Sequence, residues 1–199
     1  MSQTSDPRPV GLCPERAYCG SLMWHPAESA ARAAELVEPG DLADPRLRLI
    51  LQLVRDVVAD GASPDPVVVL ARARATGIVS SAHGIKQLAE LLADLYAECP
   101  LAGSVGHYAH AVLDLALRRR CALVGARIAQ VAESGSLTEL VRVVGSEVLE
   151  VFALRNRRAR VLTELGMPIL ELAACRPITC SEHRPRRKLS PKVSMTTTF

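Results

Sequence analysis

The sequence predicts an all-α fold, a small helical globular body plus a long helical hairpin, and two observations lead to this prediction. Ala, Leu and Val dominate the apolar residues, whereas aromatic residues make up only 3% of the 199-residue chain. That composition favours helices over sheets. Apolar residues also recur at spacings of three and four, as they do on one face of a 3.6-residue repeat. The length fits one domain with a substantial core.

Composition divides the chain into three parts. Residues 1–12 are polar and interrupted by proline, and we expect a flexible arm there. Residues 13–165 carry the helical periodicity and form the predicted domain. Residues 166–199 lose the periodicity and become basic, which predicts a disordered tail.

Start and stop signals delimit the first three helices. A short helix begins at Pro14, and a second covers about residues 28–37. Asp44 followed by Pro45 marks the start of the third helix, because Asp accepts from a free backbone amide and proline needs no amide partner in the first turn. The apolar face of this helix comprises Leu47, Ile50, Leu51, Val54, Val57 and Val58.

Two further helices complete the predicted body. One starts near Pro66 and ends before Gly77, a residue suited to a left-handed helix cap. The run Val67–Leu70 also fits a strand, but we prefer a helix because no second β-rich run exists for it to pair with. Residues 85–98 have strong helix propensity and an apolar face formed by Ile85, Leu88, Leu91, Leu92 and Leu95.

A helical hairpin follows, with arms at about residues 105–133 and 137–165. Ser136 and Glu139 fit a capping box at the start of the second arm. We expect two apolar stripes to face each other across the hairpin. They comprise Leu113, Leu117, Cys121, Val124, Ile128 and Val131 on the first arm, and Leu140, Val144, Val148, Val151 and Phe152 on the second.

Three apolar residues lie on another side of the first arm: Tyr108, Val112 and Leu115. This arm therefore has more apolar surface than one partner helix needs. Either the globular body or a second subunit covers it. These residues are our candidate self-association or partner surface, and we expect a homo-oligomer.

No motif predicts catalysis. The sequence contains no GxxxxGK[ST] phosphate loop, no GxSxG and no HExxH, so we predict that the chain is not an enzyme and needs no cofactor or metal. His107 and His110 are interpreted as polar residues at a helix start. A zinc site at Cys175, Cys180 and His183 is a minor alternative, because its spacing matches no common pattern. No segment predicts a membrane span, and we expect a cytoplasmic protein.

Arginine clusters are the remaining feature. The cluster at residues 118–120 is interpreted as a solvated girdle in preference to a phosphate contact, because no aromatic residues are interleaved with it. Two later clusters are candidate contacts for nucleic acid or an acidic partner. They comprise Arg155, Arg157, Arg158 and Arg160, and, in the tail, Arg186, Arg187 and Lys188.

The segments LVEPGDLADPRLRLILQLV and DGASPDPVVVLARARATGIV resemble the signature of the N-terminal domain of DnaB-type replicative helicases. PERAYCGSLMWHP resembles that family's opening helix, and a segment with Pro100, a His107-Tyr108 pair and arginines follows in the same order. The signature positions here are Pro39, Asp41, Leu42, Pro45, Arg48, Ile50 and Leu51. Leu42 and Leu51 stand where aromatic residues are usual, and Leu47 replaces a common His.

The resemblance implies a non-enzymatic domain whose hairpin pairs subunits into a collar and presents a surface to primase or loader proteins. The preferred interpretation is an accessory protein that contacts a replicative helicase or primase without a motor of its own. One alternative is a DNA-binding protein that uses the arginine-rich C-terminal region. Another is a non-functional remnant of a truncated helicase.

Overall fold

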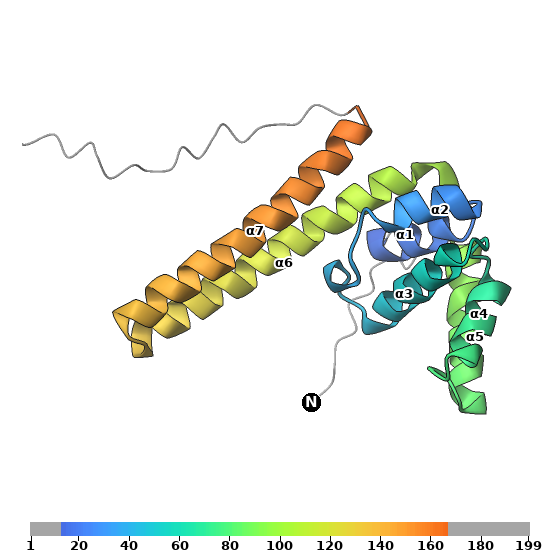
Figure 1. The fold of residues 1–199 in the computed structure, drawn as a ribbon, viewed down its shortest axis with the longest axis horizontal. Coiled ribbons are helices and arrows are strands. Elements are labelled where there is room, and N and C mark those ends of the chain that lie inside the picture. Colours follow the sequence, from blue (N-terminus) through green and yellow to red (C-terminus); the bar gives the residue numbers. More distant parts are fainter. Residues whose placement is uncertain (1–12, 167–199) are drawn as a thin grey trace, which may run out of the picture. The chain divides into compact units, whose positions relative to one another are not determined.

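The computed structural model describes residues 13–166, and the predicted arm and tail lie outside the described residues. Those residues form seven α-helices and two short 3-10 helices, with no strand among them (Figure 1). The all-α prediction is confirmed. The elements are α1 (Pro14–Leu22), α2 (Ala27–Ala34), η2 (Pro39–Asp41), α3 (Pro45–Ala59), α4 (Pro66–Ala75), α5 (Ala82–Ala97), η3 (Ala102–Ser104), α6 (Val105–Ser134) and α7 (Leu137–Glu164).

Local capping chemistry sets the helix ends. The Asp44 carboxylate accepts a hydrogen bond from the Arg46 amide at 2.8 Å at the start of α3, and the Ser136 hydroxyl accepts one from the Glu139 amide at 3.2 Å at the start of α7. Gly77 follows α4 with a φ of 69°, a left-handed conformation that costs glycine little. The segment Val67–Leu70 lies in α4, so the helical prediction is correct there.

The body is built around α1, which packs against α3, α5 and α6. Tyr18 on α1 is fully buried, and its hydroxyl donates to the Ala33 carbonyl at 2.8 Å. Burial raises the pKa of Tyr18 far above its usual range, so the phenol stays a neutral donor. Five of the six predicted core residues of α3 are buried, Val58 is partly buried, and Leu53 is buried as well.

A close backbone approach joins α1 to α5. A Cβ placed on Gly20 would lie 2.2 Å from the Leu95 carbonyl oxygen, a distance that no side chain tolerates. Glycine therefore allows the two helices to approach closely enough for Leu22 and Leu95 to be buried in the same core cluster.

The hairpin shares the core of the body at its proximal end. Four residues of α6 are buried there, Ala109, Val112, Leu113 and Ala116, and Leu154 and Val161 of α7 belong to the same cluster. Figure 1 shows α6 and α7 side by side along their length, and they form the most extensive helix pair of the described residues. Helix α7 therefore depends on α6 for most of its packing.

The predicted stripe of α6 is largely correct, and that of α7 is correct in part. Leu113 and Val124 are buried in α6, although Cys121 is exposed. In α7 the buried residues are Val143, Glu147, Leu154, Val161 and Leu162, whereas Val148 and Phe152 of the predicted stripe are exposed. Leu140, Val144 and Val151 of the predicted stripe are half-buried, so the observed seam overlaps the predicted one and differs from it at Glu147, which is buried and paired.

Candidate interaction surface

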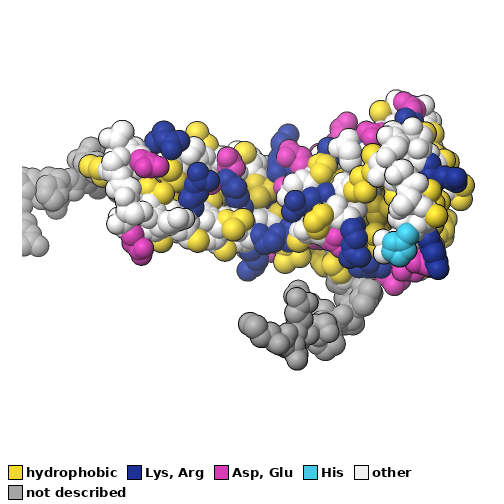
Figure 2. All heavy atoms as spheres, turned by 90° about the horizontal axis from the view of Figure 1, so that it is seen from below, with side chains coloured by type: hydrophobic (Ala, Val, Ile, Leu, Met, Phe, Trp, Pro, Cys, Tyr) yellow, Lys and Arg dark blue, Asp and Glu magenta, His cyan; other side chains and the backbone are white. Residues whose placement is uncertain are grey.

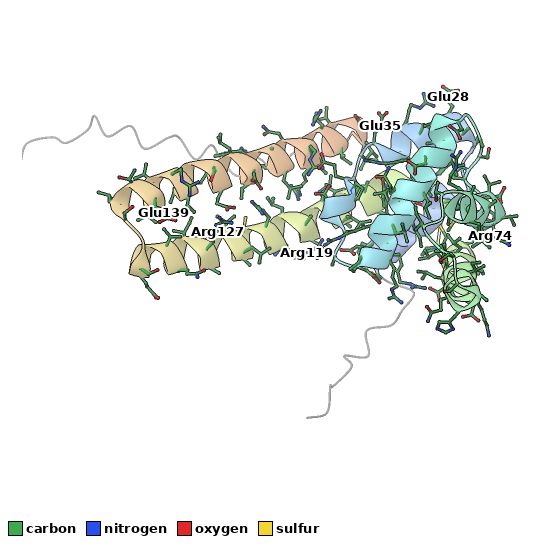
Figure 3. The ribbon with its side chains drawn as sticks, turned by 60° about the horizontal axis from the view of Figure 1, so that its bottom comes forward. Glu28, Glu35, Arg74, Arg119, Arg127 and Glu139 are labelled. Carbon is green, nitrogen blue, oxygen red and sulfur yellow. The ribbon has the colours of Figure 1, made fainter. Side chains whose placement is uncertain are left out.

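Two buried carboxylates join the hairpin to the body. Glu15 of α1 accepts from Arg119 Nη1 of α6 at 2.9 Å and from the Ala43 amide at 2.9 Å. Asp41 of η2 accepts from Arg157 of α7 through both carboxylate oxygens, at 2.7 and 2.9 Å. Each arm of the hairpin is thus fixed by a charge-assisted contact to a carboxylate that has little access to water. Figure 3 labels Arg119 where α6 passes the body.

A third buried carboxylate lies inside the hairpin. Glu147 of α7 is 2.7 Å from Arg120 and 3.4 Å from Arg127, both on α6. Arg120 also pairs with the exposed Glu150. This cluster lies between Val144 and Val148, two residues of the predicted apolar stripe. Because it requires opposite charges at fixed heights on two helices, it favours one register of the hairpin.

The solvated-girdle interpretation of residues 118–120 is wrong for two of the three arginines. Arg119 and Arg120 hold the buried carboxylates of Glu15 and Glu147. Arg118 is exposed and pairs with Asp114 one turn earlier at 2.9 Å. Consecutive arginines point in different directions around a helix, so each meets a different neighbour.

The outer side of α7 presents an exposed apolar stripe. Five large apolar residues there are exposed: Leu137, Val141, Val148, Leu149 and Phe152. Their spacings, with Gly145 between them, place them on one face of the helix. Contiguous exposed apolar surface marks interaction sites in folded proteins. We call these five residues the α7 stripe. Apolar residues at positions 137, 141, 148 and 152 share one helix face, and this pattern is the sequence signal that could have predicted the α7 stripe.

The predicted partner surface on α6 is mostly taken up by the body. Val112 is fully buried, and Tyr108 is partly buried against the core cluster. Leu115 is the exposed member of the three. The sequence allowed either the body or a second subunit to cover this surface, and Val112 is covered by the body.

The predicted basic contacts divide into two kinds. Arg157 pairs with Asp41 and Glu38, and Arg158 pairs with Asp114 at 3.1 Å. Arg155 and Arg160 are exposed and form no ion pair within residues 13–166. Arg186, Arg187 and Lys188, like the alternative zinc ligands Cys175, Cys180 and His183, lie outside the described residues.

His107 and His110 lie in the first turns of α6, as predicted. Burial and then the charge of Arg158 lower the pKa of His110, and Asp114 partly opposes them. Burial raises the pKa of Asp114, but Arg118 and Arg158 outweigh it, so that pKa lies below its usual value. Within residues 13–166 no three His, Cys, Asp or Glu side chains are grouped to hold a metal ion. No helix of these residues is long and apolar enough to cross a membrane.

Comparison with protein families gives a match to the DnaB-like helicase N terminal domain over residues 9–114, more than half of the chain. The chain belongs to this family. The matched region contains the whole body and the first turns of α6, so the remainder of the hairpin lies beyond it. The resemblance predicted from the signature segments is confirmed.

Relatives of this DnaB-like domain include replicative DNA helicases named DnaB. The protein of Leifsonia xyli subsp. xyli is 27% identical over 145 residues, which cover 72% of this chain and 31% of the relative. That of Mycobacterium leprae is 26% identical over 168 residues, which cover 82% of this chain and 26% of the relative. The chain thus spans about a third or less of these helicases.

A solved structure resembles this DnaB-like domain over most of its length. It is the N-terminal domain of DnaB helicase from Mycobacterium tuberculosis, with a TM-score of 0.60 and 26% identity. The match covers 70% of this chain and 96% of that domain. The similarity therefore concerns the N-terminal domain of the helicase and not its motor.

Proposed function

We infer that this chain is a non-catalytic interaction module of DNA replication, which self-associates and contacts a replicative helicase or primase through its hairpin. The α7 stripe is the observation that carries the inference. The relatives of this chain are replicative helicases, and the N-terminal domain of such a helicase is therefore a partner with a matching fold. The sequence contains no GxxxxGK[ST] phosphate loop, and the proposal assigns no ATP-driven step to these residues.

The stripe has the chemistry of a helix-packing surface. Burying its five side chains against a second hairpin would contribute on the order of 5 kcal/mol, before the costs of association. Gly145 in the middle of the stripe would let a partner backbone approach closely, because no atom of residues 13–166 outside its own helix backbone lies within 4 Å of a Cβ placed there. Two antiparallel hairpins that pair through these faces form a four-helix bundle.

The test places a charge on the stripe. Leu149→Asp should reduce self-association and co-elution with the host's replicative helicase or primase by at least tenfold, because it buries an unpaired carboxylate in the interface. Val67→Asp is the matched control, since Val67 is 75% exposed on α4 and Leu149 is 71% exposed on α7. Size-exclusion chromatography with light scattering and pull-downs at two salt concentrations measure both variants.

Association that Leu149→Asp abolishes and Val67→Asp leaves intact supports the proposal. Association equally strong in both variants contradicts the role of the stripe. A wild-type chain that is monomeric at high concentration, and recovers neither helicase nor primase, contradicts the proposed function as a whole.

A second candidate function is DNA binding through Arg155 and Arg160, together with Arg186, Arg187 and Lys188. The exposure of Arg155 and Arg160, which form no ion pair with residues 13–166, favours it. This candidate predicts an affinity for DNA that falls steeply with salt concentration. Replacing both α7 arginines by glutamine should then weaken DNA retention and leave the oligomeric state unchanged.

A further inference from the structure

A groove of about 530 Å³ lies between the first turns of α3 and one side of α5. Its floor is apolar and is formed by Leu49, Ile78, Val79, Leu88 and Leu91. Three of these side chains are partly buried against the core cluster, and Ile78 is 47% exposed. Apolar side chains also lie at the surface of the body, between charged ones, on the face shown in Figure 2. Exposure alone therefore does not distinguish the groove, but its hollow shape and apolar floor do.

The rim of the groove has a surplus of negative charge. The two arginines that line it are each paired with a carboxylate, at 2.7 and 2.8 Å. Glu90 and Asp94 lie one turn apart on the α5 wall. Glu90 has the exposed Lys86 at 3.8 Å, and Asp94 forms no ion pair with residues 13–166. An occupant with a basic side chain therefore matches the rim better than one with an acidic side chain.

The arm of residues 1–12 joins the body at the edge of this groove. Arg16 lines the groove and lies only three residues after Cys13, about 4.5 Å along the axis of α1. Five extended residues span roughly 17 Å, and the α5 wall from Gly84 to Asp94 is about 15 Å long. Residues 8–12 are therefore long enough to follow the whole wall. The family match begins at residue 9, so most of this segment belongs to the matched region.

We propose that residues 8–12 of the arm, RPVGL, dock in this groove of the same chain. Arg8, Val10 and Leu12 share one side of an extended segment. The two aliphatic side chains contact the floor, and the long arginine side chain reaches the carboxylates of the α5 wall. Pro9 has a fixed φ, which lowers the entropy cost of holding the segment extended.

The tether makes docking favourable even where the contacts are weak. A short flexible connection gives the segment an effective concentration in the millimolar range. The groove and the α7 stripe share no residue, so docking of the arm is independent of the proposed function.

Backbone order, measured by NMR relaxation on the full chain, tests the docking. The amides of residues 10–12 should have order parameters of about 0.85, as in rigid backbone, whereas residues 2–5 should fall below about 0.6. Ile78→Asp puts a charge on the groove floor and should lower the values at residues 10–12 below about 0.6. Val67→Asp is the control, because Val67 is 75% exposed on α4 and lies outside the groove.

Charge reversal tests the pairing of the arm with the α5 wall. Glu90→Lys combined with Asp94→Lys should lower the order parameters at residues 10–12, because Arg8 then meets like charges. Adding Arg8→Glu should restore them, since opposite charges face each other again. Glu35→Lys combined with Glu133→Lys is the matched control, because both carboxylates are exposed and lie outside the groove.

Methyl NOEs between Leu12 and Leu91 identify the chain that supplies the arm. NOEs within labelled chains diluted in unlabelled protein support docking in the same chain. NOEs that occur only between differently labelled chains assign the groove to the arm of a second copy and overturn the proposal. Order parameters below about 0.6 at residues 10–12 of the wild type overturn it as well. So do equal values in the charge-reversal variant and its control.

Discussion

Glu15, Asp41 and Glu147 are acidic residues at positions where an apolar residue would ordinarily pack. Each accepts hydrogen bonds from an arginine of the hairpin, and Glu15 and Asp41 also accept from backbone amides. Removing one partner of such a pair leaves a buried charge alone, which costs more than the pair contributes. These residues therefore fix where the arms lie more than they add to stability.

The close approach of α1 to α5 depends on Gly20, and substitution of this residue by alanine tests it. Gly20→Ala should destabilise the fold by about 1–3 kcal/mol or more, because the new Cβ would meet the backbone carbonyl of Leu95, which cannot move as a side chain can. Thermal unfolding followed by circular dichroism should show a clear drop in Tm.

Gly125→Ala is the control for that substitution. Gly125 also lies within a helix, but no other part of the described chain lies within 4 Å of a Cβ placed there. Alanine should stabilise α6 by about 0.5–1 kcal/mol, since it favours a helix more than glycine does. Equal Tm values for the two variants would show that α1 and α5 do not approach as described.

At the level of elements, the sequence predicts helix ends better than helix faces. Asp44, Gly77 and Ser136 act through their own neighbours, and each marks the predicted boundary. The buried face of α7 depends instead on what α6 presents to it. Arg120 and Arg127 draw Glu147 into the seam, and this turns Val148 and Phe152 outward. Apolar periodicity alone cannot reveal such a pairing, because it counts a glutamate as exposed.

For the candidate site, too, the sequence revealed the residue types but not their tertiary contacts. The signature residues identified the family, but they did not reveal that Asp41 is a contact between the body and the hairpin. For Val112 the sequence left covering by the body or by a second subunit open, and the structure shows that Val112 is buried against the body. Tertiary contacts decide both cases.

The charged seam of the hairpin gives a prediction that compares two glutamates of α7. Glu147→Gln should destabilise the protein by about 1–3 kcal/mol, because Arg120 and Arg127 lose a buried counter-charge. Glu150→Gln removes an exposed partner of the same Arg120 and should cost less than about 1 kcal/mol. Urea unfolding measures both, and similar losses for the two variants would contradict a buried role for Glu147.

Across the described molecule, stability should be uneven. The core cluster joins the body to the proximal hairpin and reaches α7 through Leu154 and Val161. No residue from 125 to 142 is buried, so the distal turns of both arms rest on partial contacts. Regions with few buried apolar contacts open with low free energy. The distal hairpin should therefore open independently of the body.

Hydrogen exchange at two protein concentrations tests this unevenness together with the proposed association. In dilute protein, the amides of residues 125–142 should exchange faster than those of α1 or α3, because local opening exposes them without unfolding the core. At high concentration, pairing through the α7 stripe would slow exchange across residues 137–152, since association stabilises the closed form by mass action. Helix α4 carries the exposed Val67 but no proposed interface, so its exchange should not depend on concentration. Protection that rises equally in α4 and α7 would indicate general aggregation, and protection that rises in neither would place the partner surface elsewhere.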